Sequence, residues 1–123
     1  VSWCSKLQRA VAPSSAEAEY IGLCEAVKEA IWLQRLLHEL SGNQQQVLLK
    51  CDNQAAIAIA HNPTEHSKIK HIDIKICFVR EKVEDNSVAI SYVRSRSNVA
   101  DVLTKGLQRI AHESCVWGMG MSV

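Results

Sequence analysis

A long helical segment constrains the fold of this chain more than any other feature. Ser14 and Glu17 have the spacing of a capping box, and Gly42 stands where a helix often ends in a left-handed residue. The helix predicted between them has about 26 residues and is therefore roughly 39 Å long. Its periodicity predicts one apolar stripe, formed by Leu23, Ala26, Ala30, Leu33, Leu37 and Leu40.

Glu19 falls on the same line of the helix as the apolar stripe. A carboxylate among buried apolar side chains is costly unless it is paired, protonated or bound to a metal ion. The alternative is that Glu19 lies in the first turn at the rim of the core, where the helix dipole favours a negative charge. The helix alone leaves both interpretations open.

The rest of the chain alternates between predicted strands and helices. We expect strands near residues 2–4, over the apolar run 47–51, which should be buried on both faces, and over 88–93. We expect helices over residues 53–62, 69–85 and 98–106. This order predicts an α/β domain with parallel neighbouring strands. Residues 108–123 have weak periodicity and form an undetermined tail.

The composition is that of an ordinary globular domain of 123 residues. The net charge is +1, so it forces neither a nucleic-acid nor a membrane partner. The five cysteines show no CxxC spacing, which predicts reduced cysteines in an intracellular protein. No segment is long enough to span a bilayer and no secretory signal is visible. Because the chain opens with Val1, we expect it to be a piece of a longer protein.

Two further carboxylates lie where predicted strands and helices meet. Asp52 directly follows the strand 47–51, and Asp101 lies early in the last predicted helix. In a parallel sheet such junctions can gather at one edge, where Glu19, Asp52 and Asp101 would bind Mg²⁺. Two such ions can support phosphodiester hydrolysis. The alternatives are that Asp52 caps the following helix and that Asp101 compensates a helix dipole.

Other polar and aromatic residues carry weaker signals. His61, His66 and His71 are spaced by five residues and interrupted by Pro63, so they do not predict a zinc site. Side chains that could contact phosphates, or simply be solvated, are Lys68, Lys70, Lys75, Arg94, Arg96 and Lys105. Side chains that could stack on bases are Trp3, Trp32 and Trp117.

Three motifs in this order resemble the ribonuclease H domain of copia-type retrotransposon Pol polyproteins. They are SWCSKLQRAVAPSSAEAEY, CDNQAAIAIAHNPTEHSKIKHIDI and VADVLTKGL, and the resemblance covers residues 1–107. It implies a ribonuclease H-like fold and a metal-dependent endonuclease that cuts the RNA strand of RNA–DNA hybrids. The family's carboxylates fall on Glu19, Asp52 and Asp101, which would bind two Mg²⁺ ions, or Mn²⁺ in their place.

The resemblance also implies the cellular setting. The expected partners are an RNA–DNA hybrid and the upstream reverse transcriptase part of the same polyprotein, with no membrane and no small-molecule substrate. The expected location is cytoplasmic, in a virus-like particle. By resemblance, His71 and Asp73 in the motif KHIDI are structural or close to the substrate rather than catalytic.

The sequence departs from the family pattern at several points. The family's first two strands and the aspartate on the first strand lie upstream of the SWCSK motif, so the expected fold is truncated. The loop RSRSN lacks the histidine of many cellular relatives, and TKGL lacks the proline of TKPL. We therefore keep three alternatives: an impaired but active endonuclease, an inactive remnant with at most weak nucleic-acid binding, and an unrelated α/β binding module. We also expect the isolated chain to fold poorly.

Overall fold

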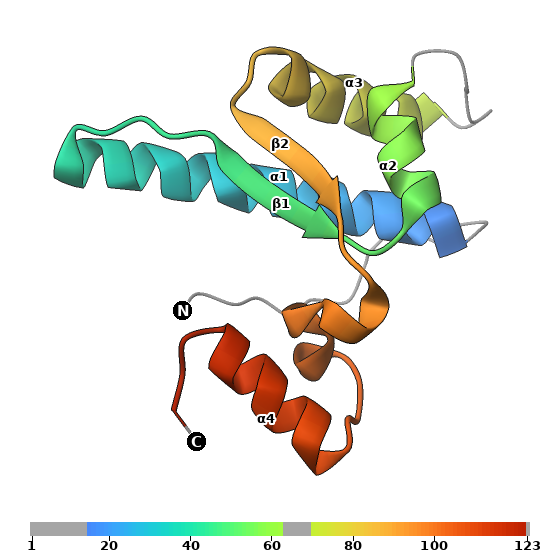
Figure 1. The fold of residues 1–123 in the computed structure, drawn as a ribbon. Coiled ribbons are helices and arrows are strands. Elements are labelled where there is room, and N and C mark those ends of the chain that lie inside the picture. Colours follow the sequence, from blue (N-terminus) through green and yellow to red (C-terminus); the bar gives the residue numbers. More distant parts are fainter. Residues whose placement is uncertain (1–14, 63–69, 123) are drawn as a thin grey trace. The chain divides into compact units, whose positions relative to one another are not determined.

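The computed structural model describes residues 15–62 and 70–122 (Figure 1). These residues form two compact units, one over residues 15–92 and the other over residues 93–122, and each is described by itself. The predicted strand near residues 2–4 lies outside the described residues. The elements of the first unit are α1 (Ser15–Ser41), β1 (Val47–Cys51), α2 (Gln54–His61), α3 (Lys70–Glu84) and β2 (Val88–Tyr92). The elements of the second are the 3₁₀ helices η1 (Ser95–Ser97) and η2 (Val99–Leu103) and the helix α4 (Arg109–Gly118).

The described strands of the first unit form a two-stranded parallel sheet. The register runs from Val47 opposite Val88 to Cys51 opposite Tyr92, and the helices α2 and α3 connect the two strands. In Figure 1 the strands lie side by side, and α1 passes behind them in contact with both. The α/β class and the parallel pairing predicted from the sequence are therefore confirmed.

The C-terminal end of α1 follows the sequence signal closely, whereas the predicted cap Ser14 lies outside the described residues. Gly42 has a positive φ of +71°, and its N–H donates to the carbonyl oxygen of His38 at 2.7 Å. Glycine adopts this left-handed conformation without the steric cost that a side chain adds. The helix has 27 residues and ends at Ser41, as predicted.

The buried face of α1 differs from the predicted stripe. Leu23 and Ala30 are buried as expected, but Ala26, Leu37 and Leu40 are exposed. A strand of five residues is about 17 Å long, whereas the helix is about 40 Å long. The described strands are therefore too short to cover the whole helix, and its buried residues all lie at or before Ala30. They are Tyr20, Ile21, Leu23, Cys24, Val27 and Ala30.

The core of the first unit lies between the three helices and one face of the sheet. It includes Tyr20 and Val27 from α1, Ala56 and Ala60 from α2, and Ile76, Val79, Cys51 and Val88. The prediction that β1 is buried on both faces is wrong, because its residues alternate and Leu48 is 56% exposed. Among the described helices, none is both long enough and apolar enough to cross a membrane.

The second unit combines 3₁₀ turns with α4. The motif VADVLTKGL begins a helix where the sequence predicts one, but η2 is a 3₁₀ helix capped by Asn98, whose Oδ1 accepts from the Ala100 N–H at 3.2 Å. The segment after residue 107, undetermined from the sequence, contains α4. In α4 the Arg109 Nε lies 2.8 Å from the Glu113 carboxylate, one helical turn away.

Gly118 marks the close approach of α4 to η2. A Cβ at this position would lie 2.6 Å from Cγ1 of Val99, a β-branched side chain with little freedom to move. We expect Gly118→Ala to lower the free energy of unfolding of this unit by about 1–3 kcal/mol. Amide hydrogen exchange of α4 measures this. Gly106→Ala is the matched control, because no atom lies within 4 Å of its Cβ. Equal protection of α4 in both variants would contradict the prediction.

Candidate functional site

Asp52 lies at the carboxyl end of β1, where the chain turns into α2. Its side chain is half-buried. The residue that caps α2 is Asn53, whose Oδ1 accepts from the Ala56 N–H at 3.0 Å. The alternative that Asp52 serves as this cap is therefore wrong. Its carboxylate stands at a strand end, where open α/β sheets bind ligands.

Glu19 lies in the second turn of α1 and is exposed. Of the two interpretations that the helix leaves open, its exposure supports the position at the rim, because the buried face begins at its neighbour Tyr20 and continues through Leu23 and Cys24. The carboxylate therefore occupies the rim of the core, as the alternative interpretation has it.

Asp52 and Glu19 both affect the thiol of Cys51. Burial raises the pKa of this thiol, and the negative charges of Asp52 and Glu19 raise it further. Both carboxylates therefore contribute to the raised pKa of one thiol at the end of β1, although they are 33 residues apart in the sequence.

Asp101 belongs to the second unit, in η2. Its side chain is 14% exposed, and its carboxylate accepts a hydrogen bond from the Lys105 ammonium at 2.8 Å. The spacing of four residues in DVLTK is the signal that could have identified this pair in the sequence. A cation that binds Asp101 has to compete with Lys105 for the carboxylate.

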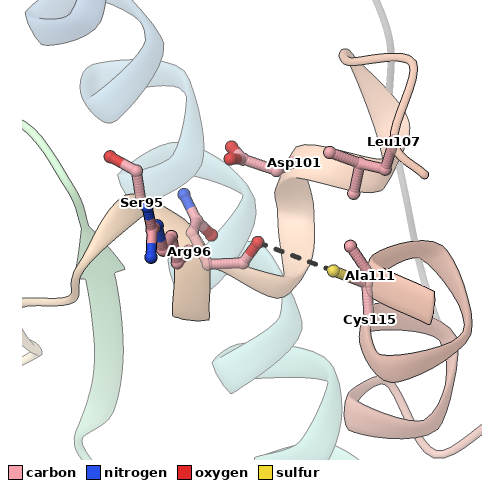
Figure 2. Close-up of a pocket in the computed structure, with 7 residues that line it drawn as sticks. Ser95, Arg96, Asp101, Leu107, Ala111 and Cys115 are labelled. Carbon is pink, nitrogen blue, oxygen red and sulfur yellow. Dashed lines mark hydrogen bonds between the residues drawn. The ribbon is translucent and has the colours of Figure 1, made fainter.

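Asp101 also lines a pocket within the second unit (Figure 2). Arg96 from η1 and Cys115 from α4 line the same pocket, and the Cys115 thiol donates to the Asn98 carbonyl oxygen at 4.0 Å. Figure 2 shows this hydrogen bond beside Asp101. The pocket therefore combines the carboxylate of Asp101 with one cationic side chain, that of Arg96.

The donor set of the first unit fits a hard cation better than a soft one. Glu19 and Asp52 offer carboxylate oxygens, which Mg²⁺ prefers, and like charges acting on one region are relieved by a cation. Among the described side chains, no group of three histidine, cysteine or acidic residues gathers to hold a metal ion. A site with three carboxylates stays a prediction, and so do the Mg²⁺ and Mn²⁺ cofactors.

The other residues that the sequence singled out are mostly at the surface. Trp32 and Trp117 are exposed. Lys75 lies 3.8 Å from Glu25 of α1, and Arg94 and Arg96 are exposed. His61 is exposed at the end of α2. Outside the described residues or side chains lie Trp3, His66, Lys68, Lys70, His71 and Asp73.

Comparison with known proteins finds relatives along nearly the whole chain. It is 43% identical over 121 residues to the retrovirus-related Pol polyprotein from transposon TNT 1-94 of Nicotiana tabacum, a match that covers 98% of this chain. It is 36% and 35% identical to those from transposons RE2 and RE1 of Arabidopsis thaliana, over 93% and 99% of this chain.

The relatives are much longer than this chain. The match covers 9% of the Nicotiana polyprotein and 8% of each Arabidopsis polyprotein. No family model matches the chain. No solved structure gives a significant match. The resemblance to retroelement Pol polyproteins is confirmed, and the chain is homologous to a short segment of retrovirus-related Pol polyproteins from transposons.

Proposed function

We propose that this chain is part of a ribonuclease H-like domain of a copia-type Pol polyprotein, a metal-dependent endonuclease that hydrolyses the RNA strand of RNA–DNA hybrids. The observation that carries the proposal is the position of Asp52 at the carboxyl end of a parallel strand, where Glu19 and Asp52 both raise the pKa of the Cys51 thiol. The homology to transposon Pol polyproteins and the three motifs of the sequence support it.

The chemistry of the proposal rests on oxygen ligands. Glu19 and Asp52 would hold Mg²⁺, and by the family resemblance Asp101 would be a ligand as well. When bound, the ion would polarise the scissile phosphate and activate water. Asp52 suits this role because Asn53, and not Asp52, caps α2, so the Asp52 carboxylate is not used for capping.

Exposed cations suit the nucleic-acid partner of the proposal. Arg94 and Arg96 are exposed at η1, and Lys50 is exposed on the open face of β1. Arginine donates paired hydrogen bonds to phosphate oxygens, so these side chains would hold the backbone of a hybrid without reading its sequence. We propose the same polyprotein's reverse transcriptase portion as the upstream partner.

The test is cleavage of a hybrid whose RNA strand is labelled, with Mg²⁺ present. We compare the 123-residue chain with a version extended upstream by polyprotein sequence from a close relative. Cleavage by either protein, lost when Mg²⁺ is chelated, supports the proposed function. Failure of both proteins to cleave, with both folded, contradicts it.

The second candidate, an inactive remnant, is favoured by the pairing of Asp101 with Lys105.

The Lys105–Asp101 pair gives a prediction of its own. Lys105→Met removes the ammonium that competes for the carboxylate, so we expect Mn²⁺ to bind near Asp101 roughly two- to fivefold more tightly. Paramagnetic broadening of the Asp101 amide signal on titration with Mn²⁺ measures the affinity. The control is Arg109→Met, which removes a cation that pairs with Glu113 instead. Equal Mn²⁺ affinities in the two variants would show that Lys105 does not compete with the metal ion for the Asp101 carboxylate.

A further inference from the structure

Arg80 joins two helices of the first unit. It lies on α3, beside the buried Val79, and its side chain is half-buried. Its Nη2 donates to the carbonyl oxygen of Ile59 at 3.0 Å and also to that of Asn62. Both acceptors belong to the last turn of α2 and its C-cap. The guanidinium therefore closes the end of a helix that is distant from it in the sequence.

The helix α2 depends on such support because it is short. Its eight residues make about two turns, and isolated helices of this length are marginal in water. The last carbonyl groups of a helix have no N–H partners within it. The Asn62 N–H donates to the carbonyl oxygen of Ala58 at 2.8 Å, and the Arg80 guanidinium donates to that of Ile59. The positive charge of Arg80 also interacts favourably with the partial negative charge at this end of the helix dipole.

The apolar packing of α2 uses small or partly buried side chains. Its fully buried side chains are those of Ala56 and Ala60, each a single methyl group, and Ile57 and Ile59 pack against the core while remaining partly exposed. Charge-assisted hydrogen bonds are stronger than neutral ones and define direction. Arg80 thus adds directed hydrogen bonds to the apolar packing between α2 and α3.

The other end of α2 carries the candidate ligand Asp52. The turn Asp52–Asn53 precedes the helix, and the Asn53 side chain caps it by accepting a hydrogen bond from the Ala56 N–H. Toward α1, Tyr20 lies in the same buried cluster as Ala60 and Val79. Its hydroxyl and the Arg80 Nε are both enclosed and have no hydrogen-bond partner among the described residues. The elements that carry Asp52 and Glu19 are therefore joined to the same core region as Arg80.

We propose that Arg80 is a positioning residue, which holds α2 in place and so fixes the Asp52 carboxylate at the far end of that helix. The consequence for metal binding rests on the proposed function. The effect on α2 does not, because it follows from the hydrogen bonds alone.

The experiment measures both effects on the 123-residue chain. In Arg80→Met we expect amide exchange at Ala56 and Ile57, whose N–H groups bond to Asn53, to accelerate roughly tenfold, since a charged hydrogen bond is lost at the other end of the helix. We also expect Mn²⁺ broadening of the Asp52 amide to need several times more metal. Arg80→Lys keeps the charge without the planar fork and should recover part of both effects.

Lys82→Met is the matched control, because it removes a cation from the same helix that pairs with Glu81 and Asp85 instead. It should change neither readout. Unchanged exchange at Ala56 and Ile57 in Arg80→Met, or equal acceleration in every element, would overturn the proposal. Absence of Mn²⁺ broadening at Asp52 in the parent contradicts the proposed function, and the exchange data then still decide the role of Arg80 in holding α2.

Discussion

Asp52→Asn is expected to lower the rate of hybrid cleavage roughly 100-fold or more, while the stability of the chain stays nearly unchanged. The loss follows because the amide keeps the shape of the side chain but removes a charge that would bind Mg²⁺, and metal catalysis is worth several kcal/mol of the barrier. Stability is spared because Asp52 does not cap α2. The measurement is the initial rate of RNA cleavage with Mg²⁺, in whichever form of the protein cleaves, together with urea unfolding.

Two matched variants separate chemistry from folding. Asn53→Ala removes the cap of α2 and should cost about 1 kcal/mol of stability without changing any charge. Glu29→Gln removes an exposed carboxylate from the same helix as Glu19 and should leave cleavage unchanged, whereas Glu19→Gln should impair it. If Asp52→Asn cleaves like the parent, Asp52 is not a metal ligand and the proposed function fails.

The sequence predicts the elements of the first unit well because their signals are local. The glycine after α1 and the apolar run of β1 each depend on neighbouring residues, and the structure confirms the end of α1 and the bounds of β1. Burial is predicted less well, since it depends on which element covers each face. A periodic stripe cannot show that the five-residue strands are too short to cover the whole of α1, which leaves Leu37 and Leu40 exposed.

The candidate site shows the same division between local and distant information. The strand-end position of Asp52 follows from the sequence, but the choice between Asp52 and Asn53 as the cap needed side-chain geometry. The approach of Glu19 and Asp52 to Cys51 depends on how α1 packs on β1, which no spacing encodes. Arg80 was missed because its acceptors, the carbonyl groups of Ile59 and Asn62, are backbone atoms that carry no sequence signature.

The buried phenol of Tyr20 predicts a marked loss of stability in alkali. Tyr20 is 0% exposed, and burial raises the pKa of its hydroxyl, an effect that the charge of Arg80 only partly offsets. In the unfolded chain the same hydroxyl ionises near pH 10. Unfolding therefore releases a proton above this pH, so the stabilising contribution of Tyr20 is complete below pH 10 and is lost as the pH rises further. We expect a loss of about 1.4 kcal/mol per pH unit from this residue.

Tyr20→Phe isolates this contribution in urea unfolding measured between pH 8 and pH 11.5. It removes the ionisable group together with a buried hydroxyl that has no hydrogen-bond partner among the described residues, so stability at pH 8 should be equal or higher. Above pH 10 its slope should be shallower than that of the parent. The buried thiols of Cys24 and Cys51 have raised pKa values as well, so some loss above pH 9 should remain. Tyr92→Phe, at an exposed tyrosine, should keep the full slope of the parent. If the free energy of unfolding of Tyr20→Phe falls with pH as steeply as that of the parent, then this phenol ionises without opening the core formed by α1, α2 and α3.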